Sequence, residues 1–313
     1  MAPPAVAAEA DVRDDAPLRP VRTRSPRVRA EHGSVAGSEA HWLAAGNGAP
    51  VVLVHGLGNS SAAWRRVMPG LARSHHVIAP DLPGFGHSSP VESDDLLDAY
   101  CVFVAELIER AGGGVPAAIV GNSVGGAVAL RVALTRPHLV SRLVLVDPAG
   151  VGQGVPSWWR LVRFEGAVRA VSAIPLTLMP RPMIEWVIGT AYRRITFSQP
   201  DRVSDRTVRL FAQQLNSRER IHRFLRNAHE IVDAFERDVQ SLERPLPVPV
   251  LALWGRDDRL VPLHDALALL ERIGELEVRI LEGCGHSPQL EQPDAFLDAV
   301  LPFLGARSSR PRA

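Results

Sequence analysis

Short runs of residues that are apolar at nearly every position recur along the chain. They fall at 51–54, 77–79, 117–120, 143–146, 250–254 and 278–281. Unbroken apolar runs are typical of strands that are covered on both faces, as in a parallel sheet. Segments with helical spacing lie between them, at about 96–110, after residue 123 and at about 264–272. This alternation predicts an α/β protein with a mostly parallel, doubly wound sheet.

The alternation stops near Gly150 and resumes near Pro247, and 209–235 carries the clearest helical period of this interval. Because ordinary loops are far shorter, we expect a helical lid at 151–246. It would be inserted between a first part of the core at 32–150 and a second part at 247–305. Residues 1–31 and 306–313 lack periodicity, so we expect a disordered leader and a flexible tail.

Composition excludes several classes of function. The 313 residues include 35 basic and 34 acidic side chains, a formal net charge of +1, so no overall field attracts nucleic acid or an anionic membrane. Every basic residue is arginine, which excludes Schiff-base lysines, Ser-Lys dyads and phosphate-loop lysines.

The remaining composition bears on compartment and metal binding. Cys101 and Cys284 are far apart in the sequence, which favours two buried thiols over a disulfide scaffold or a zinc site. No apolar run reaches the roughly 20 residues of a membrane span. The N-terminal segment has no apolar signal core, so we expect a cytoplasmic protein.

The strongest chemical motif is Gly121-Asn122-Ser123-Val124-Gly125. It matches G-x-S-x-G directly after a predicted strand and before a helix of small residues, which is the context this motif requires. A sharp strand-to-helix turn would present the Ser123 hydroxyl at the carboxyl edge of the sheet, next to the positive end of a helix.

A serine hydroxyl needs a base, and the base needs an acid to orient it. His286 follows the last predicted strand and is the best candidate base; His55 is its rival. Asp257 and Asp258 follow the strand at 250–254, and Asp147 follows an earlier strand. The residues alone leave these three acids open.

Taken together, these segments resemble the α/β-hydrolase fold superfamily over roughly residues 35–305. The matching motifs are VVLVHGLG (51–58), DLPGFGHS (81–88), GNSVGG (121–126), WGRDDRLVP (254–262) and GCGHSPQLEQP (283–293). Their occurrence in this order is specific for the fold and much less so for the substrate.

The resemblance implies a member with a serine nucleophile and a helical cap. Ser123 would be the nucleophile, His286 the general base and Asp258 its orienting acid. The backbone N–H groups of Leu57 and Val124 would hold the oxyanion. No metal or organic cofactor is implied.

The lid would be the family's cap domain. His55 would orient the loop that carries Leu57, or it would touch the substrate. Asp81 and the glycines after it match a family turn that is mostly architectural. Candidate aromatic residues for the pocket under the cap are Trp158, Trp159, Phe164, Trp186 and Phe197.

A serine nucleophile argues against the epoxide hydrolases and haloalkane dehalogenases of this fold, which use aspartate. The partner is expected to be a small-molecule ester or related carbonyl compound. We rank hydrolysis of a small carboxylic ester first. A C–C bond hydrolase of the meta-cleavage-product type ranks second. Those enzymes typically carry an aromatic residue where this chain has Ser287, and an oxyanion loop richer in small residues than 55–59. A ligand-binding or signalling protein on the same fold and an acyltransferase are the further alternatives. The oligomeric state stays open.

Overall fold

The computed structural model of the chain describes residues 26–149, 180–239, 246–264 and 276–306. Its strands form one eight-stranded sheet in the order β1-β2-β4-β3-β5-β6-β7-β8. Strands β3 to β8 pair in parallel, and β1 and β2 join one edge by antiparallel pairing. The strands are β1 (Arg29–Val35), β2 (Ser38–Ala45), β3 (Ala49–Val54), β4 (His75–Pro80), β5 (Ala117–Asn122), β6 (Val140–Val146), β7 (Val250–Gly255) and β8 (Leu276–Leu281).

Every predicted apolar run is a strand of this sheet, and the predicted α/β fold is therefore confirmed. The described helices and 3-10 turns are η1 (Ser61–Trp64), α1 (Met68–Leu71), α2 (Leu96–Ala111), α3 (Val124–Thr135), η2 (Pro137–Leu139), α6 (Arg181–Thr196), η4 (Pro200–Arg202), α7 (Asp205–Gln214), α8 (Arg218–Val239), α10 (Pro288–Glu291) and α11 (Pro293–Gly305). The helix predicted at about 264–272 lies almost wholly outside the described residues.

The sheet has a hydrophobic core on each face. In β3, Val52 and Val54 point to the side that α2 and α3 cover, whereas Val51 and Leu53 point to the side of α1 and α11. All four side chains are fully buried. Because successive side chains of a strand point to opposite faces, a strand covered on both sides must be apolar throughout, and this produces the unbroken runs in the sequence.

The first hairpin was not predicted, and it corrects the boundary of the leader. Strand β1 begins at Arg29, inside the segment expected to be disordered, and pairs with β2 from the partners Arg29 and Ala44 onwards. Ala36 and Gly37, both with positive φ, make the two-residue turn, which matches the twist of an antiparallel hairpin. Most residues of β1 are exposed, so this edge strand has no apolar run to reveal it.

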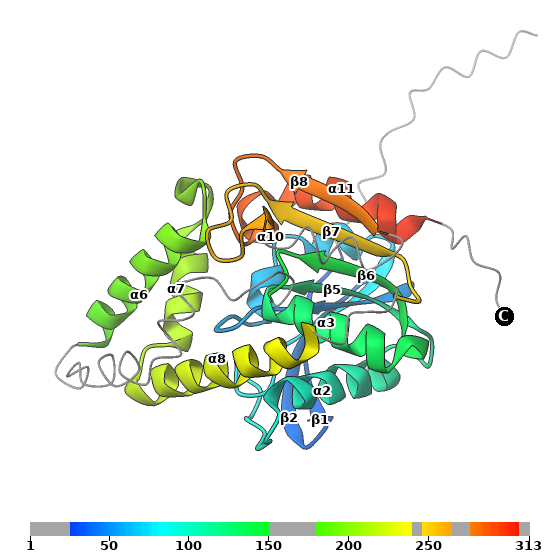
Figure 1. Ribbon diagram of the computed structural model, residues 1–313, viewed down its shortest axis with the longest axis horizontal. Coiled ribbons are helices and arrows are strands. Elements are labelled where there is room, and N and C mark those ends of the chain that lie inside the picture. Colours follow the sequence, from blue (N-terminus) through cyan, green and yellow to red (C-terminus); the bar gives the residue numbers. More distant parts are fainter. Residues whose placement is uncertain (1–25, 150–179, 240–245, 265–275, 307–313) are drawn as a thin grey trace, which may run out of the picture.

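The described part of the insertion is helical. Figure 1 shows α6 and α7 beyond the carboxyl ends of the parallel strands, with α8 running from them alongside α2. The segment with helical spacing at 209–235 does not form one helix, because α7 ends at Gln214 and α8 begins at Arg218. There Ser217 accepts the N–H of Arg220 on its hydroxyl and the N–H of Ile221 on its carbonyl, which starts a new helix.

Candidate active site

Ser123 lies in the sharp turn between β5 and α3. Its φ of 55° and ψ of −122° are strained for a residue with a side chain. The turn is held by its own N–H, which donates to the carbonyl of Val146 at 3.0 Å. A Cβ on Gly121 would lie 2.2 Å from the carbonyl oxygen of Gly125, so only glycine permits this bend. The half-buried serine thus stands at the N-terminus of α3, as the motif predicts.

His286 and Asp258 come together from two loops at the same edge of the sheet. Nδ1 of His286 lies 2.7 Å from Oδ2 of Asp258, and both side chains are buried. Oδ1 of Asp258 accepts the N–H groups of Leu260 and Val261 at 2.7 and 3.0 Å. Since the carboxylate can only accept, Nδ1 carries the proton and Nε2 is left as the basic atom.

The structure distinguishes the acids that the sequence left open. Asp257 is exposed and accepts the Ser198 hydroxyl at 2.6 Å, so it does not contact the imidazole. Asp147 is fully buried, and its Oδ1 accepts the N–H of Gly255 at 2.8 Å. Only Asp258 therefore forms the hydrogen bond that orients His286.

Asn122 ties the serine turn to the histidine loop. Its Nδ2 donates to the carbonyl oxygens of His286 and Val146 at 3.0 and 3.1 Å, and its Oδ1 accepts the amide of Gln289. Sequence reasoning used the glycines of this motif and passed over the asparagine. The only signal in the sequence was a polar residue at the end of an otherwise apolar strand.

Leu57 lines the same cavity as Ser123, and Val124 directly follows Ser123 in the chain. Within the described residues, the backbone N–H of neither residue donates a hydrogen bond. Val124 is the first residue of α3, where N–H groups have no partner inside the helix. Gly56 brings the loop close, since a Cβ there would lie 3.1 Å from that of Ser123. Both N–H groups therefore remain candidates to hold an anionic oxygen.

His55 does not line the cavity that Ser123 and His286 share. Its side chain is fully buried. Nδ1 lies 2.8 Å from the carbonyl of Gly56, and Nε2 accepts the N–H of Leu82 at 2.9 Å. Burial lowers the pKa of its imidazole, consistent with a neutral ring that accepts on Nε2. The candidate role in substrate binding is thus replaced by a role inside the loop.

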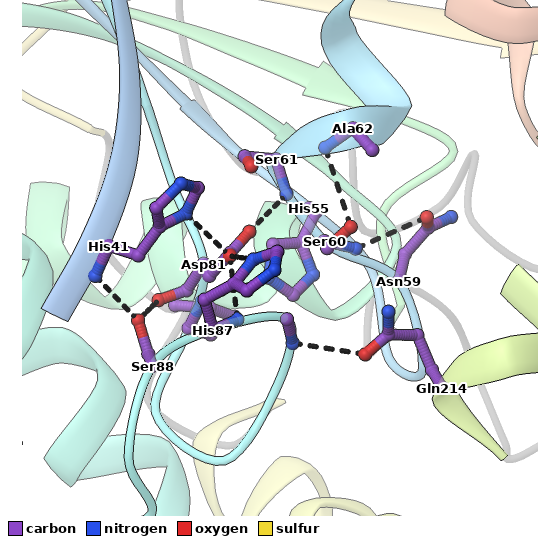
Figure 2. A network of polar contacts seen from close by, with 12 residues as sticks. His41, His55, Asn59, Ser60, Ser61, Ala62, Asp81, His87, Ser88 and Gln214 are labelled. Carbon is purple, nitrogen blue, oxygen red and sulfur yellow. Dashed lines mark hydrogen bonds and ion pairs between the residues drawn. The ribbon is translucent and has the colours of Figure 1, made fainter. Parts of the chain in front are cut away.

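The buried carboxylate of Asp81 is hydrogen-bonded to the segment that follows the Leu57 loop (Figure 2). Oδ1 of Asp81 accepts the N–H of Ser61 at 2.6 Å, and Oδ2 accepts the N–H of His87 at 2.9 Å and lies 2.8 Å from Nδ1 of His41. The hydroxyl of Ser88 donates to the carbonyl of Asp81 and accepts the N–H of His41. Because Ser61 follows the Leu57 loop, this network helps to fix the position of that loop.

A cavity of about 330 Å³ opens under the cap beside Ser123 and His286. Besides Ser123 and His286, its polar lining residues are Asn59, Asn122, Tyr192, Thr196 and Ser287, and the rest is mostly apolar. Tyr192 of α6 and Phe211 of α7 stack at 3.7 Å between ring centroids, and both line the cavity. The other apolar lining residues are Leu57, Ala149, Ile188, Ala191, Ile195, Leu215, Phe224, Leu225, Ala228, Leu260 and Val261.

The cap residues proposed from sequence do not supply this lining. Trp186 points outward and is 69% exposed, and Phe197 is buried against Tyr192 outside the cavity. Trp158, Trp159 and Phe164 lie outside the described residues. Tyr192 and Phe211 were missed because helical spacing alone does not tell which face of a cap helix looks down on the core.

Two groups of side chains of the types that ligate metals lie close together in the described residues. They are His41, Asp81 and His87, and Asp147, Asp258 and His286. Hydrogen bonds already engage members of both groups. No described helix is long and apolar enough to cross a bilayer.

Comparison with known proteins identifies the family. The model of the alpha/beta hydrolase family matches residues 51–299. The chain belongs to the α/β-hydrolase family. This membership confirms the resemblance seen in the sequence.

Two of the similar proteins are named for related compounds. A 2-hydroxy-6-oxo-6-(2'-aminophenyl)hexa-2,4-dienoic acid hydrolase from Metapseudomonas resinovorans is 30% identical over 285 residues, which cover 88% of this chain and 91% of that protein. The structure of 2-hydroxy-6-oxo-6-phenylhexa-2,4-dienoate hydrolase from Rhodococcus sp. strain RHA1 matches with a TM-score of 0.72 at 27% identity, over 90% of this chain and 100% of that one. A bacterial membrane phospholipase A matches with a TM-score of 0.69 at 26% identity, over 88% and 86%.

Proposed function

We propose that the protein hydrolyses a carbon–carbon bond next to a ketone, in a substrate of the 2-hydroxy-6-oxo-dienoate class. The similarity to two α/β-hydrolases named for such substrates carries this proposal. It reverses the ranking made from sequence, which placed small esters first. That ranking depended on two short segments, at Ser287 and at 55–59, whereas the similarity extends over most of the chain.

Ser123, His286 and Asp258 are the proposed catalytic residues. Nε2 of His286 takes the hydroxyl proton while Oγ of Ser123 attacks the ketone carbon, and Asp258 stabilises the imidazolium. The N–H groups of Leu57 and Val124 stabilise the oxyanion, each by about 3 kcal/mol. Tyr192, Phe211 and their apolar neighbours enclose the side of the substrate that remains on the serine.

Cleavage of a C–C bond requires a leaving carbon that can hold the bonding electron pair. In a 2-hydroxy-6-oxo-dienoate, transfer of the 2-hydroxyl proton to carbon 5 gives a keto form with one remaining double bond. When the bond between carbons 5 and 6 breaks, its electron pair is delocalised onto the oxygen at carbon 2, and His286 returns the proton. Water then attacks the acyl ester on Ser123, which releases a carboxylic acid and restores the hydroxyl.

The test uses 2-hydroxy-6-oxo-6-phenylhexa-2,4-dienoate and p-nitrophenyl butyrate with wild type and Ser123→Ala. We expect stoichiometric benzoate from the dienoate, with kcat/KM at least about tenfold above that for the ester, and no turnover by the variant. An inert dienoate together with rapid ester hydrolysis would reject the C–C proposal. Failure of a fluorophosphonate to label Ser123 would reject the nucleophile itself.

Ester hydrolysis is the second candidate, and the cavity supplies the observation that favours it. A dienoate carries a carboxylate, for which arginine is a common partner, yet the cavity lining within the described residues includes no arginine. An apolar acyl chain needs no such partner. The same two substrates separate the candidates, and product analysis with added alcohol would detect acyl transfer.

A further inference from the structure

A second carboxyl group lies beside the proposed triad. Asp147 follows β6, is fully buried and has a φ of 43°, which is uncommon outside glycine. Its N–H donates to the carbonyl of Leu253 at 3.0 Å, and its Oδ1 accepts the N–H of Gly255 at 2.8 Å. Its Oδ2 is buried and accepts no hydrogen bond in the described part of the chain. A buried polar atom left in this way calls for a physical explanation.

The neighbours of Asp147 supply that explanation. One oxygen each of Asp147 and Asp258 and a ring nitrogen of His286 all lie within 4.8 Å of one another. Two ionised carboxylates so close together in a buried site would repel each other strongly. Asp258 already accepts two backbone N–H groups and lies 2.7 Å from the imidazole nitrogen. These donors stabilise a negative charge on Asp258 better than the single N–H group that Asp147 accepts.

The remaining titratable groups around Asp147 act in the same direction. Burial raises the pKa of Asp147, and the negative charges of Asp258 and Glu291 raise it further. Burial also raises the pKa of the Cys284 thiol, which keeps that neighbour neutral. His286, the one basic group of the cluster, is engaged with Asp258. The cluster therefore favours a neutral acid at position 147.

We propose that Asp147 is a positioning residue of the triad, a neutral acid whose Oδ2 hydroxyl donates a hydrogen bond to the Asp258 carboxylate. This contact would keep Asp258 aimed at Nδ1 of His286 and fill the unsatisfied position on Oδ2. The inference rests on the triad of the proposed function. If Asp147 only anchored Gly255, its carboxyl group would need no proton.

Infrared spectroscopy detects that proton without any substrate. We expect wild type to show the C=O stretch of a protonated carboxylic acid, sensitive to D₂O, and Asp147→Asn to lack this band at neutral pH. Absence of the band from wild type, or its persistence in the variant, would overturn the proposal. If wild type is not labelled by a fluorophosphonate, the proposed function fails, while the band still decides the protonation of Asp147.

The labelling rate of Ser123 as a function of pH gives the second readout. Asp147→Asn keeps a neutral hydrogen-bond donor, so its acid limb should coincide with that of wild type and its rate at pH 7 should stay within about threefold. Asp147→Leu removes the donor and should slow labelling by about tenfold or more. A limb displaced to lower pH by about one unit in Asp147→Asn would mean that wild type carries a charge at Asp147, contrary to the proposal.

Discussion

Replacement of Asp81 by alanine tests whether the buried carboxylate behind the Leu57 loop holds that loop in place. The substitution leaves the N–H groups of Ser61 and His87 without their acceptor and removes the partner of His41. Each unsatisfied buried donor costs about 1–3 kcal/mol. We therefore expect the free energy of unfolding to fall by about 3–5 kcal/mol at pH 7, with slower labelling of Ser123.

The loss should depend on pH in a direction that the structure defines. Burial by itself would raise the pKa of Asp81, but the hydrogen bonds that the carboxylate accepts from the N–H groups of His87 and Ser61 lower it, and the pKa lies below its ordinary value. A carboxyl group with a lowered pKa in the folded state stabilises the fold above its unfolded pKa. This contribution is lost as the pH falls through the folded pKa. The difference between wild type and variant should therefore narrow below about pH 4.

Urea unfolding, followed by tryptophan fluorescence at several pH values, measures this difference. Ser88→Ala is the matched control, because it removes a neutral hydroxyl from the same network and should cost only about 1 kcal/mol, with little change across pH. If Asp81→Ala stays within about 1 kcal/mol of wild type at pH 7, or if its loss is the same at low pH, the bracing role of the carboxylate is refuted.

Two further predictions concern the carboxyl edge of the sheet, where the proposed catalytic residues lie. Asp258→Asn should slow labelling of Ser123 by about 10³–10⁴-fold, because an amide favours the wrong imidazole tautomer. Exposed Asp257→Asn should leave the rate nearly unchanged, and equal effects of the two substitutions would contradict the assignment of the acid. Gly125→Ala would place a Cβ 2.1 Å from the carbonyl oxygen of Val54, so its midpoint in urea should fall sharply or the protein should fail to fold. Gly305→Ala, with open space around its Cβ, should be near wild type in the same assay.

Much of the fold was predictable from local sequence because it depends on local burial. Strands covered on both faces have to be apolar at every position, so the parallel strands stand out in the sequence. The hairpin of β1 and β2 does not, because an exposed antiparallel edge needs no such pattern. The break between α7 and α8 was also missed, since the helical spacing of apolar residues continues on both sides of Ser217.

The sequence by itself predicted Ser123 and His286 as the nucleophile and the base of the proposed hydrolase. Both follow from local sequence: glycines flank the turn at Ser123, and an apolar run precedes the loop of His286. Only the tertiary structure decided which acid meets the imidazole, because Asp147 and Asp258 follow different strands that the sheet brings to one edge. It also decided that His55 forms hydrogen bonds within the loop instead of lining the cavity, and that Tyr192 and Phe211 line the cavity. Such contacts depend on how distant segments pack, and no spacing along the chain records this.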